Sequence, residues 1–220
     1  MTVKLIMCGR RRPGQTLREH RCHMKDIHGA LLLDYIAREP ENAPCGYVQN
    51  HAIDSTFASG DPAHEPLAFG FDFVTEVWFA DLARAKASRE TDYYRERLLP
   101  DEPKMVDTVR VLGLPYSETM IEPATIQPDA YKLFVVMGKD TVLAPETLSA
   151  ARKDMPQTLG YSRNLALVPG PITAIDTFRF ADLESAYSFA DVYQPALSTQ
   201  VEGQAAVMVI AKEYLLYPIR

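Results

Sequence analysis

The residues best suited to acid–base chemistry are concentrated in one part of this 220-residue sequence. All five histidines lie within the first 64 residues, and the three cysteines and the single tryptophan also lie in the first half. Histidine titrates nearest to neutral pH, so it is the usual general acid or base. This asymmetry predicts that the first half carries the site and that the second half forms a lid or an opposite wall.

Two histidines stand in contexts that favour catalysis. His28 precedes Gly29 near the end of a helix-like segment, where an acid or base at a cavity mouth and a backbone-bonded structural histidine are the two alternatives. His51 shares one face of a strand-like segment with Tyr47 and Gln49. Three polar groups are costly to bury in a core, which favours a cavity lining. We expect His51 or His28 to be the general base.

Glu76 and Trp78 lie on one face of the strand-like segment 71–79, whose other face is apolar. The apolar face suits packing against helices, so we expect Glu76 and Trp78 in an interior shared by the two halves. An ionised glutamate is costly to bury, which predicts a partly polar cavity, with a structural salt bridge as the alternative. There Glu76 would orient or charge-balance the histidine, and Trp78 would stack on the substrate.

Further polar side chains complete the predicted site. Tyr47 and Arg179 would polarise a carbonyl or stabilise a developing enolate or phenolate. Arg10 begins the run Arg10–Arg12, which is either a solvated strand end or an anion contact. The predicted catalytic residues are His51, His28, Glu76 and Tyr47, and the predicted substrate-binding residues are Trp78, Gln49, Arg179 and Arg10.

A zinc site is the main rival at the histidines. His20 and His23 lie three residues apart with His28 nearby, but neither a His-x-x-x-His spacing nor a second carboxylate partner accompanies them. We therefore predict no metal, and we expect His20, His23 and His64 at the surface. No nucleophile elbow, dinucleotide fingerprint or P-loop pattern is present, so we also predict no cofactor.

Composition and charge limit the partners. The formal net charge is −6 and the pI is near 5.4, which argues against nucleic acid because phosphate contacts need a basic face. The longest apolar stretch, 205–211, is too short to span a bilayer, and no signal-like segment opens the chain. Three cysteines without a C-x-x-C pair favour a reducing compartment. We predict a cytoplasmic protein whose partner is a small hydrophobic or aromatic molecule, with no nucleic acid and no membrane.

The elements that must position these residues are organised as a repeat. The tetrapeptide Phe-Ala-Asp-Leu occurs at 79–82 and at 180–183, each time between a strand-like and a helix-like segment. Each half has the order βαββαβ, which is the ferredoxin-like unit. We predict an α+β fold of tandem ferredoxin-like repeats whose antiparallel sheets pack face to face as an α/β barrel. The repeats cover 1–122 and 129–220, with the site in the first.

Capping and turn signals set the predicted bounds. Thr16 followed by Glu19 is a capping-box pattern, so a helix begins there and ends before Pro40, and Asp81 caps a second helix. A polar loop is expected over 54–70. The predicted strands cover 3–9, 46–53, 71–79 and parts of 108–121, then 131–138, 162–168, 172–180 and 205–215, and the second half has helices over 145–154 and 182–193.

Three segments of the first half resemble the EthD-like family of dimeric α/β-barrel proteins. They are the strand-to-helix entry 9–16, the helix end 24–31 with its His-Gly pair, and the strand 71–79. That strand is similar to an Asp-Gly-x-x-Glu-x-Trp pattern, with Phe73 where glycine is usual, and 47–51 is similar to a Tyr-x-Gln-x-His pattern of some members. The resemblance covers residues 3–121 and implies a dimeric barrel around a small-molecule cavity.

The resemblance implies a fold better than it implies a reaction. Its broader superfamily includes cofactor-free cyclases, dehydratases, decarboxylases, isomerases and monooxygenases. We predict a cofactor-independent lyase, dehydratase, cyclase or isomerase acting on a hydrophobic, aromatic or polyketide-like carbonyl compound. The alternatives are a non-catalytic small-molecule binder or stress-type accessory protein, and a haem- or oxygen-dependent monooxygenase. A tandem chain can complete a barrel internally, so both a monomer and a homodimer are compatible with the sequence.

Overall fold

The fold is mixed α+β, as predicted. The structure is a computed structural model that describes residues 2–57, 70–138, 156–200 and 206–219. Its strands pair in the cyclic order β1-β3-β2-β8-β5-β7-β6-β4, which is a closed barrel. The chain divides into two compact units: unit 1 contains 1–51, 71–117 and 214–220, and unit 2 contains 52–70 and 118–213.

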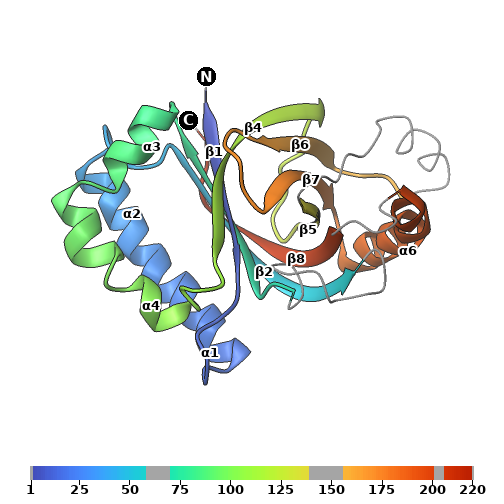
Figure 1. Ribbon diagram of the computed structural model, residues 1–220, viewed down its shortest axis with the longest axis horizontal. Coiled ribbons are helices and arrows are strands. Elements are labelled where there is room, and N and C mark those ends of the chain that lie inside the picture. The colour runs from blue at the N-terminus through green and yellow to red at the C-terminus, as the bar shows by residue number, and fades with distance from the viewer. Residues whose placement is uncertain (1, 58–69, 139–155, 201–205, 220) are drawn as a thin grey trace. The chain divides into compact units, whose positions relative to one another are not determined.

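Unit 1 is an antiparallel sheet covered on one face by helices (Figure 1). The strands are β1 (Val3–Gly9), β2 (Gly46–Phe57), β3 (Phe73–Phe79) and β4 (Leu112–Glu122), paired in the order β4-β1-β3-β2. The helical segments are α1 (Leu17–Cys22), η1 (His23–His28), α2 (Gly29–Arg38), α3 (Leu82–Ser88), η2 (Tyr94–Leu98) and α4 (Glu102–Met105). The first three follow one another without a break.

The helix starts confirm the predicted capping signals. At α1, the Thr16 hydroxyl accepts from the Glu19 N–H at 3.2 Å, and the Glu19 carboxylate accepts from the Thr16 N–H at 2.8 Å. This reciprocal pair is a complete capping box. At α3, the Asp81 carboxylate accepts from the Arg84 N–H at 2.8 Å. Because α2 ends before Pro40, its predicted end is also confirmed.

The two faces of β3 differ as predicted. Phe73, Val77 and Phe79 pack against buried side chains of the helices. Successive residues of a strand alternate sides, so Glu76 and Trp78 lie on the opposite face, where they are 1% and 6% exposed.

Unit 2 repeats the strand order of unit 1. Its strands are β5 (Tyr131–Gly138), β6 (Gly160–Ala166), β7 (Ile172–Phe180) and β8 (Ala206–Tyr217), paired as β8-β5-β7-β6. The helix α6 (Leu183–Gln200) packs on β5 and β7 (Figure 1). Its core contains the aromatic cluster Tyr161, Phe178, Phe180, Phe189 and Tyr193.

Equivalent positions of the two units make equivalent hydrogen bonds. The Asn50 side chain of β2 donates to the Val74 carbonyl at 2.9 Å, and the Asn164 side chain of β6 donates to the Ile175 carbonyl at 2.9 Å. Both pairs join the second and third strands of their units. This correspondence supports the duplication that the repeated tetrapeptide indicates.

Several predicted bounds differ from the structure, among them β4, which begins at Leu112 rather than 108, and β6, which covers Gly160–Ala166 rather than 162–168. β2 continues to Phe57, so the loop does not begin at Asp54. The α6 helix runs through Pro195 to Gln200, beyond the predicted end, because Leu197 continues its buried apolar face.

Two further predictions concern a helix of the second half and the absence of a membrane span. The helix predicted over 145–154 lies outside the described residues. Among the helices that the structure describes, none is long and apolar enough to cross a membrane.

Candidate active site

The clearest cluster of catalytic residue types in unit 1 is built around Asp101. His23 Nε2 lies 3.0 and 3.1 Å from the two carboxylate oxygens of Asp101, and His28 Nδ1 lies 3.1 Å from Oδ2. The Asp101 side chain is 3% exposed, whereas the His23 and His28 side chains are 16% and 13% exposed. A buried carboxylate therefore holds two imidazole rings that keep partial access to solvent.

The backbone of η1 explains why two residues five apart share one partner. This segment is a π-helix, in which each N–H bonds the carbonyl five residues earlier, and the Gly29 N–H bonds the Met24 carbonyl in this way. Residues five apart, such as His23 and His28, consequently lie nearly above one another. In an α-helix they would be about 140° apart around the axis. The π-helix thus turns both rings toward Asp101.

Asp101 lies in the turn that joins the π-helical segment η2 to α4, directly before the first residue of α4. The Leu99 N–H bonds the Tyr94 carbonyl at 2.8 Å at the end of η2, and the Asp101 N–H bonds the Leu98 carbonyl at 3.0 Å. Lys104 Nζ lies 3.5 Å from Asp101 Oδ1. The backbone of Asp101 is therefore held in a turn, and Lys104 contacts its carboxylate in addition to the two histidines.

The charge of Asp101 assigns the protons on the two rings. Hydrogen bonds from His28 and then His23 lower the pKa of Asp101 to about 2, although burial opposes the shift. An ionised carboxylate only accepts hydrogen bonds, so His23 Nε2 and His28 Nδ1 carry protons. The opposite nitrogens, Nδ1 of His23 and Nε2 of His28, then hold the lone pairs that can accept a proton.

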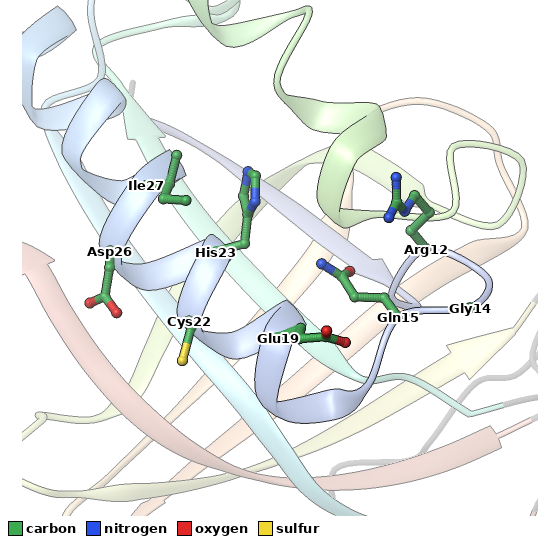
Figure 2. A pocket seen from close by; sticks show the side chains of 8 residues that line it. All are labelled: Arg12, Gly14, Gln15, Glu19, Cys22, His23, Asp26 and Ile27. Atoms are coloured by element: carbon green, nitrogen blue, oxygen red, sulfur yellow. The ribbon is translucent and has the colours of Figure 1, made fainter.

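A pocket of about 510 Å³ lies beside His23 (Figure 2). The Gln15 amide extends from its loop toward the helix that carries His23, and Arg12 lies on the same loop. Cys22 and Asp26 point to the other side of that helix. The pocket lining consists of Arg12, Gly14, Gln15, Glu19, Cys22, His23, Asp26 and Ile27.

A tight turn carries Arg12 and Gln15. The Gln15 N–H bonds the Arg12 carbonyl at 3.1 Å, and Pro13 and Gly14 occupy the central positions. Gly14 has a φ of +82°, and glycine adopts that conformation without the penalty that a side chain brings. Proline followed by such a glycine is the residue order of a type II turn. The wall of the pocket opposite His23 is therefore rigid.

Tyr47, Gln49 and His51 share one face of β2, as predicted, and this is the face that the helices cover. Gln49 Nε2 donates to the Met24 carbonyl in η1 at 2.6 Å and also bonds the Tyr47 hydroxyl. Gln49 Oε1 lies 3.3 Å from His51 Nε2. All three side chains are buried, and none of them lines the pocket beside His23. They lie beneath η1 and support it.

The environment of His51 does not suit a general base near neutral pH. Burial lowers the pKa of His51 to about 3, with smaller effects from nearby positive charges. Its ring packs against Tyr214 with centroids 4.6 Å apart. A base is most effective when its pKa lies near the working pH, so the low pKa argues against His51 as the general base.

Glu76 and Trp78 are brought together by Lys4 rather than by a histidine. Glu76 Oε1 lies 2.6 Å from Lys4 Nζ, and Oε2 accepts from Asn50 Nδ2 at 2.9 Å. Lys4 Nζ also lies 4.8 Å from the centre of a Trp78 ring. The geometry thus matches the salt-bridge alternative for Glu76.

The two predicted arginines are engaged with protein groups. In unit 2, Arg179 Nε donates to Glu213 at 2.7 Å, and its terminal nitrogens donate to the carbonyls of Thr125 and Gln127. In unit 1, Arg10 Nε lies 3.9 Å from Asp72 Oδ2. Arg10 does not line the pocket beside His23, whereas its neighbour Arg12 does.

Several residues of this site were not among the predicted ones. His23 was expected at the surface, and Asp101 and Gln15 had no predicted role. The expected exposure of His20 is wrong, because its ring is fully buried and Nδ1 lies 2.9 Å from the Met105 carbonyl. His64 lies outside the described residues. The five-residue spacing of His23 and His28 is the sequence signal for this pair of histidines. An α-helix would put residues with that spacing on different sides, so the signal is informative only for a π-helix.

Comparisons with known proteins agree with the fold. Residues 12–109 match the sequence profile of the EthD domain. An anthrone oxidase-like protein matches with a TM-score of 0.56 and 9% identity, covering 98% of this chain and 93% of that one. Chlorite dismutase from Candidatus Nitrospira defluvii, in complex with imidazole, matches with a TM-score of 0.53 and 9% identity, covering 98% of this chain and 92% of that one. A proposed monooxygenase of Lactobacillus acidophilus NCFM matches with a TM-score of 0.52 and 10% identity, covering 98% of this chain and 97% of that one.

These neighbours contradict the predicted reaction class. They are named as an oxidase-like protein, a dismutase and a monooxygenase, and none of the three is named as a lyase or isomerase. The prediction of a cofactor-independent lyase, dehydratase, cyclase or isomerase is therefore wrong. The names of these neighbours agree better with the haem- or oxygen-dependent alternative.

The described residues do not fit a haem. Haem iron takes an axial histidine, cysteine, methionine or tyrosine. The second half of the sequence has no histidine or cysteine, and the core of unit 2 encloses Met137, Tyr161, Tyr193 and Met208. In unit 1, the rings of the described histidines are bonded to protein groups as given above. Over the same described ranges, no cluster of three or more His, Cys, Asp or Glu side chains could hold a metal ion.

The segment that matches the EthD domain contains the candidate site. The EthD match starts at Arg12, on the loop of the pocket, and extends past Asp101 to residue 109, so it contains the whole His23–Asp101–His28 cluster. The family resemblance read from the sequence is confirmed. Residues 12–109 of this chain are therefore similar to the EthD domain.

Proposed function

We propose that this protein is an oxygen-dependent oxidase or monooxygenase whose site is the pocket beside His23 in the first repeat. Its substrate class is small aromatic carbonyl compounds with an acidic C–H bond. The observation that carries the proposal is the Asp101 carboxylate, which holds His23 at the edge of a pocket lined by Arg12. The names of the anthrone oxidase-like and monooxygenase neighbours support the oxidative reaction class.

The chain's own residues can supply the acid–base part of this reaction. His23 Nδ1 takes a proton from the carbon near the substrate carbonyl, and Asp101 stabilises the imidazolium through its contacts with Nε2. The Arg12 guanidinium offsets the negative charge that develops on the substrate oxygen. His28 keeps Asp101 in place and ionised.

The oxidation then balances with dioxygen as the co-reactant. The carbanion transfers two electrons to O2, which forms a C–O bond, and the His23 imidazolium returns a proton to the peroxide oxygen. Loss of the second C–H proton breaks the O–O bond and releases water. The methylene carbon loses four electrons to O2 and becomes a ketone, so CH2 and O2 give C=O and H2O.

The direct test is oxygen uptake with anthrone as the substrate. We expect His23→Ala to lower the rate by about 10²–10⁴, the range for a general base. Arg18→Ala is the matched control, because Arg18 is an exposed residue of α1, on the same continuous helical segment as His23, that does not line the pocket. Anthrone-dependent thermal stabilisation without oxygen uptake would reject catalysis in favour of a binding protein.

A further inference from the structure

Asp72 belongs to the segment 71–79 that resembles the EthD-like strand pattern, but the proposed reaction gives it no role. Its side chain is 14% exposed, and Arg11 occupies both of its carboxylate oxygens. Oδ2 accepts from the Arg11 N–H at 2.9 Å, and Oδ1 accepts from Arg11 Nη1 at 2.7 Å. Hydrogen bonds between ionised groups are among the stronger ones in proteins, so Asp72 holds the Arg11 side chain in one position.

The same guanidinium also reaches the turn that lines the pocket beside His23. Arg11 Nε donates to the Gln15 carbonyl at 2.9 Å, and Gln15 closes the turn that begins at Arg12. We call the connection from Asp72 through Arg11 to the Gln15 carbonyl the arginine clamp. The arginine clamp ties this turn to the residue that precedes β3, which lies 61 positions beyond Arg11 in the sequence.

A second attachment holds the turn from the side of Asp101. The Arg12 N–H bonds the Met105 carbonyl at 3.0 Å, and Met105 ends α4, the helix that Asp101 directly precedes. The turn is thus attached to α4 through the backbone and to the start of β3 through the arginine clamp. Because the arginine clamp is made by side chains, substitution can remove it and leave the backbone bond in place.

We propose that Arg11 and Asp72 are positioning residues of this pocket, and that the arginine clamp holds Arg12 where its guanidinium meets a developing oxygen anion. The inference rests on the proposed function, because that function gives Arg12 its role. Arg12 is exposed, so a fixed backbone limits the conformations that its long side chain loses when an anion binds. The described residues that line the pocket do not include Arg11 or Asp72, so both act through the turn.

Charge offers a competing explanation, and it can be separated from position. Arg11→Met removes a positive charge and Asp72→Ala removes a negative charge, but each variant breaks the arginine clamp. If charge alone acted, Arg11→Met would weaken the binding of an anion and Asp72→Ala would strengthen it. If position acts, both variants should weaken the binding.

The test measures the binding of anthracene-9-carboxylate, a stable anion with the ring system of anthrone, by titration calorimetry without oxygen. We expect Arg11→Met and Asp72→Ala each to lower the affinity by about two- to tenfold, the range for ordering one side chain on binding. Arg12→Met should lower the affinity at least as much. Adding either clamp substitution to Arg12→Met should then change the affinity no further, because residues that act as one unit are not additive.

The matched control is the Arg38–Asp34 pair of α2, an exposed pair joined at 2.8 Å that is not part of the pocket lining. Arg38→Met and Asp34→Ala make the same changes of charge, and they should keep the affinity within about twofold of the wild type. If Asp72→Ala does not fold, as thermal unfolding would show, Arg11→Met decides alone, because a pure charge effect would persist in the Arg12→Met background.

Three results would overturn the inference. They are a wild-type protein that does not bind the probe, a clamp variant that binds it as tightly as the wild type or more tightly, and a clamp substitution that keeps its full effect in the Arg12→Met background. The expected pattern of binding without oxygen uptake on anthrone would leave the inference standing and reject the proposed reaction.

Discussion

In the proposed reaction, the base depends on a carboxylate that two histidines share. Asp101 orients His23 and His28 through nitrogens that must carry protons, which leaves one basic nitrogen on each ring. The sequence predicts His28 as a candidate because of its place before a glycine, but it does not predict Asp101, which lies 73 residues later. A contact over that distance depends on how the helices pack, and no local pattern records it.

The contrast between His51 and His23 shows why a residue type alone does not identify a base. Both are histidines of the first half, but His51 is 4% exposed and packed on Tyr214, whereas His23 borders a pocket. The alternation of β2 predicts that His51 shares a face with Gln49 and Tyr47. It does not say whether that face meets helices or a cavity, because either would keep the same period.

The low pKa of His51 predicts how stability changes with pH. In the unfolded chain a histidine has a pKa near ~6.5, and in the fold the pKa of His51 falls to about 3. Below about pH 6.5 the unfolded state therefore binds a proton that the folded state does not. The contribution of neutral His51 is fully present above that pH, and it is lost as the pH falls toward 3, by up to about 1.4 kcal/mol per pH unit.

The measurement is the free energy of unfolding in urea at several values between pH 4 and 7. We expect His51→Gln to show a shallower loss of stability on acidification than the wild type, because glutamine does not titrate. His20 has a pKa that burial also lowers, so some slope should remain in the variant. Identical slopes in the two proteins would show that His51 is not held neutral by burial.

At the scale of the elements, the π-helix η1 brings His23 and His28 together at Asp101. The capping box at Thr16 and the stop before Pro40 predict that a helix lies here, and both signals are confirmed. These two signals do not predict that the middle of the helix, His23–His28, has π-helical rather than α-helical hydrogen bonds. That feature depends on tertiary support, since Gln49 of β2 donates to the same Met24 carbonyl that the π-helical N–H bonds.

Removing the support from β2 should therefore weaken the fold and disturb the site. Gln49→Leu removes one of the two hydrogen bonds of the Met24 carbonyl and leaves the Tyr47 hydroxyl without its buried partner, and we expect a loss of about 1–3 kcal/mol in the free energy of unfolding. The matched control is Gln127→Leu, whose side chain bonds the Ala181 carbonyl at an exposed position and should change stability by about 0.5 kcal/mol or less. Urea denaturation measures both, and equal effects would argue against a supporting role for Gln49.

At the scale of the whole molecule, the proposed function places the chemistry in only one copy of a duplicated fold. The repeated Phe-Ala-Asp-Leu predicts the strand order of both units, and the equivalent bonds of Asn50 and Asn164 agree with that prediction. The uneven distribution of histidines predicts which unit to search. The reaction class was beyond the sequence, because this fold supports many chemistries and a shared barrel does not determine which one a chain performs.

The central claim is that this chain uses dioxygen to oxidise an aromatic carbonyl compound with His23 as the base. Turnover of anthrone under ¹⁸O₂ tests it most directly, with the ketone product analysed by mass spectrometry. The account predicts one labelled oxygen in the product, the other in water, and loss of this incorporation in His23→Ala. Product formation without label, or label that persists at the wild-type rate in His23→Ala, would contradict it.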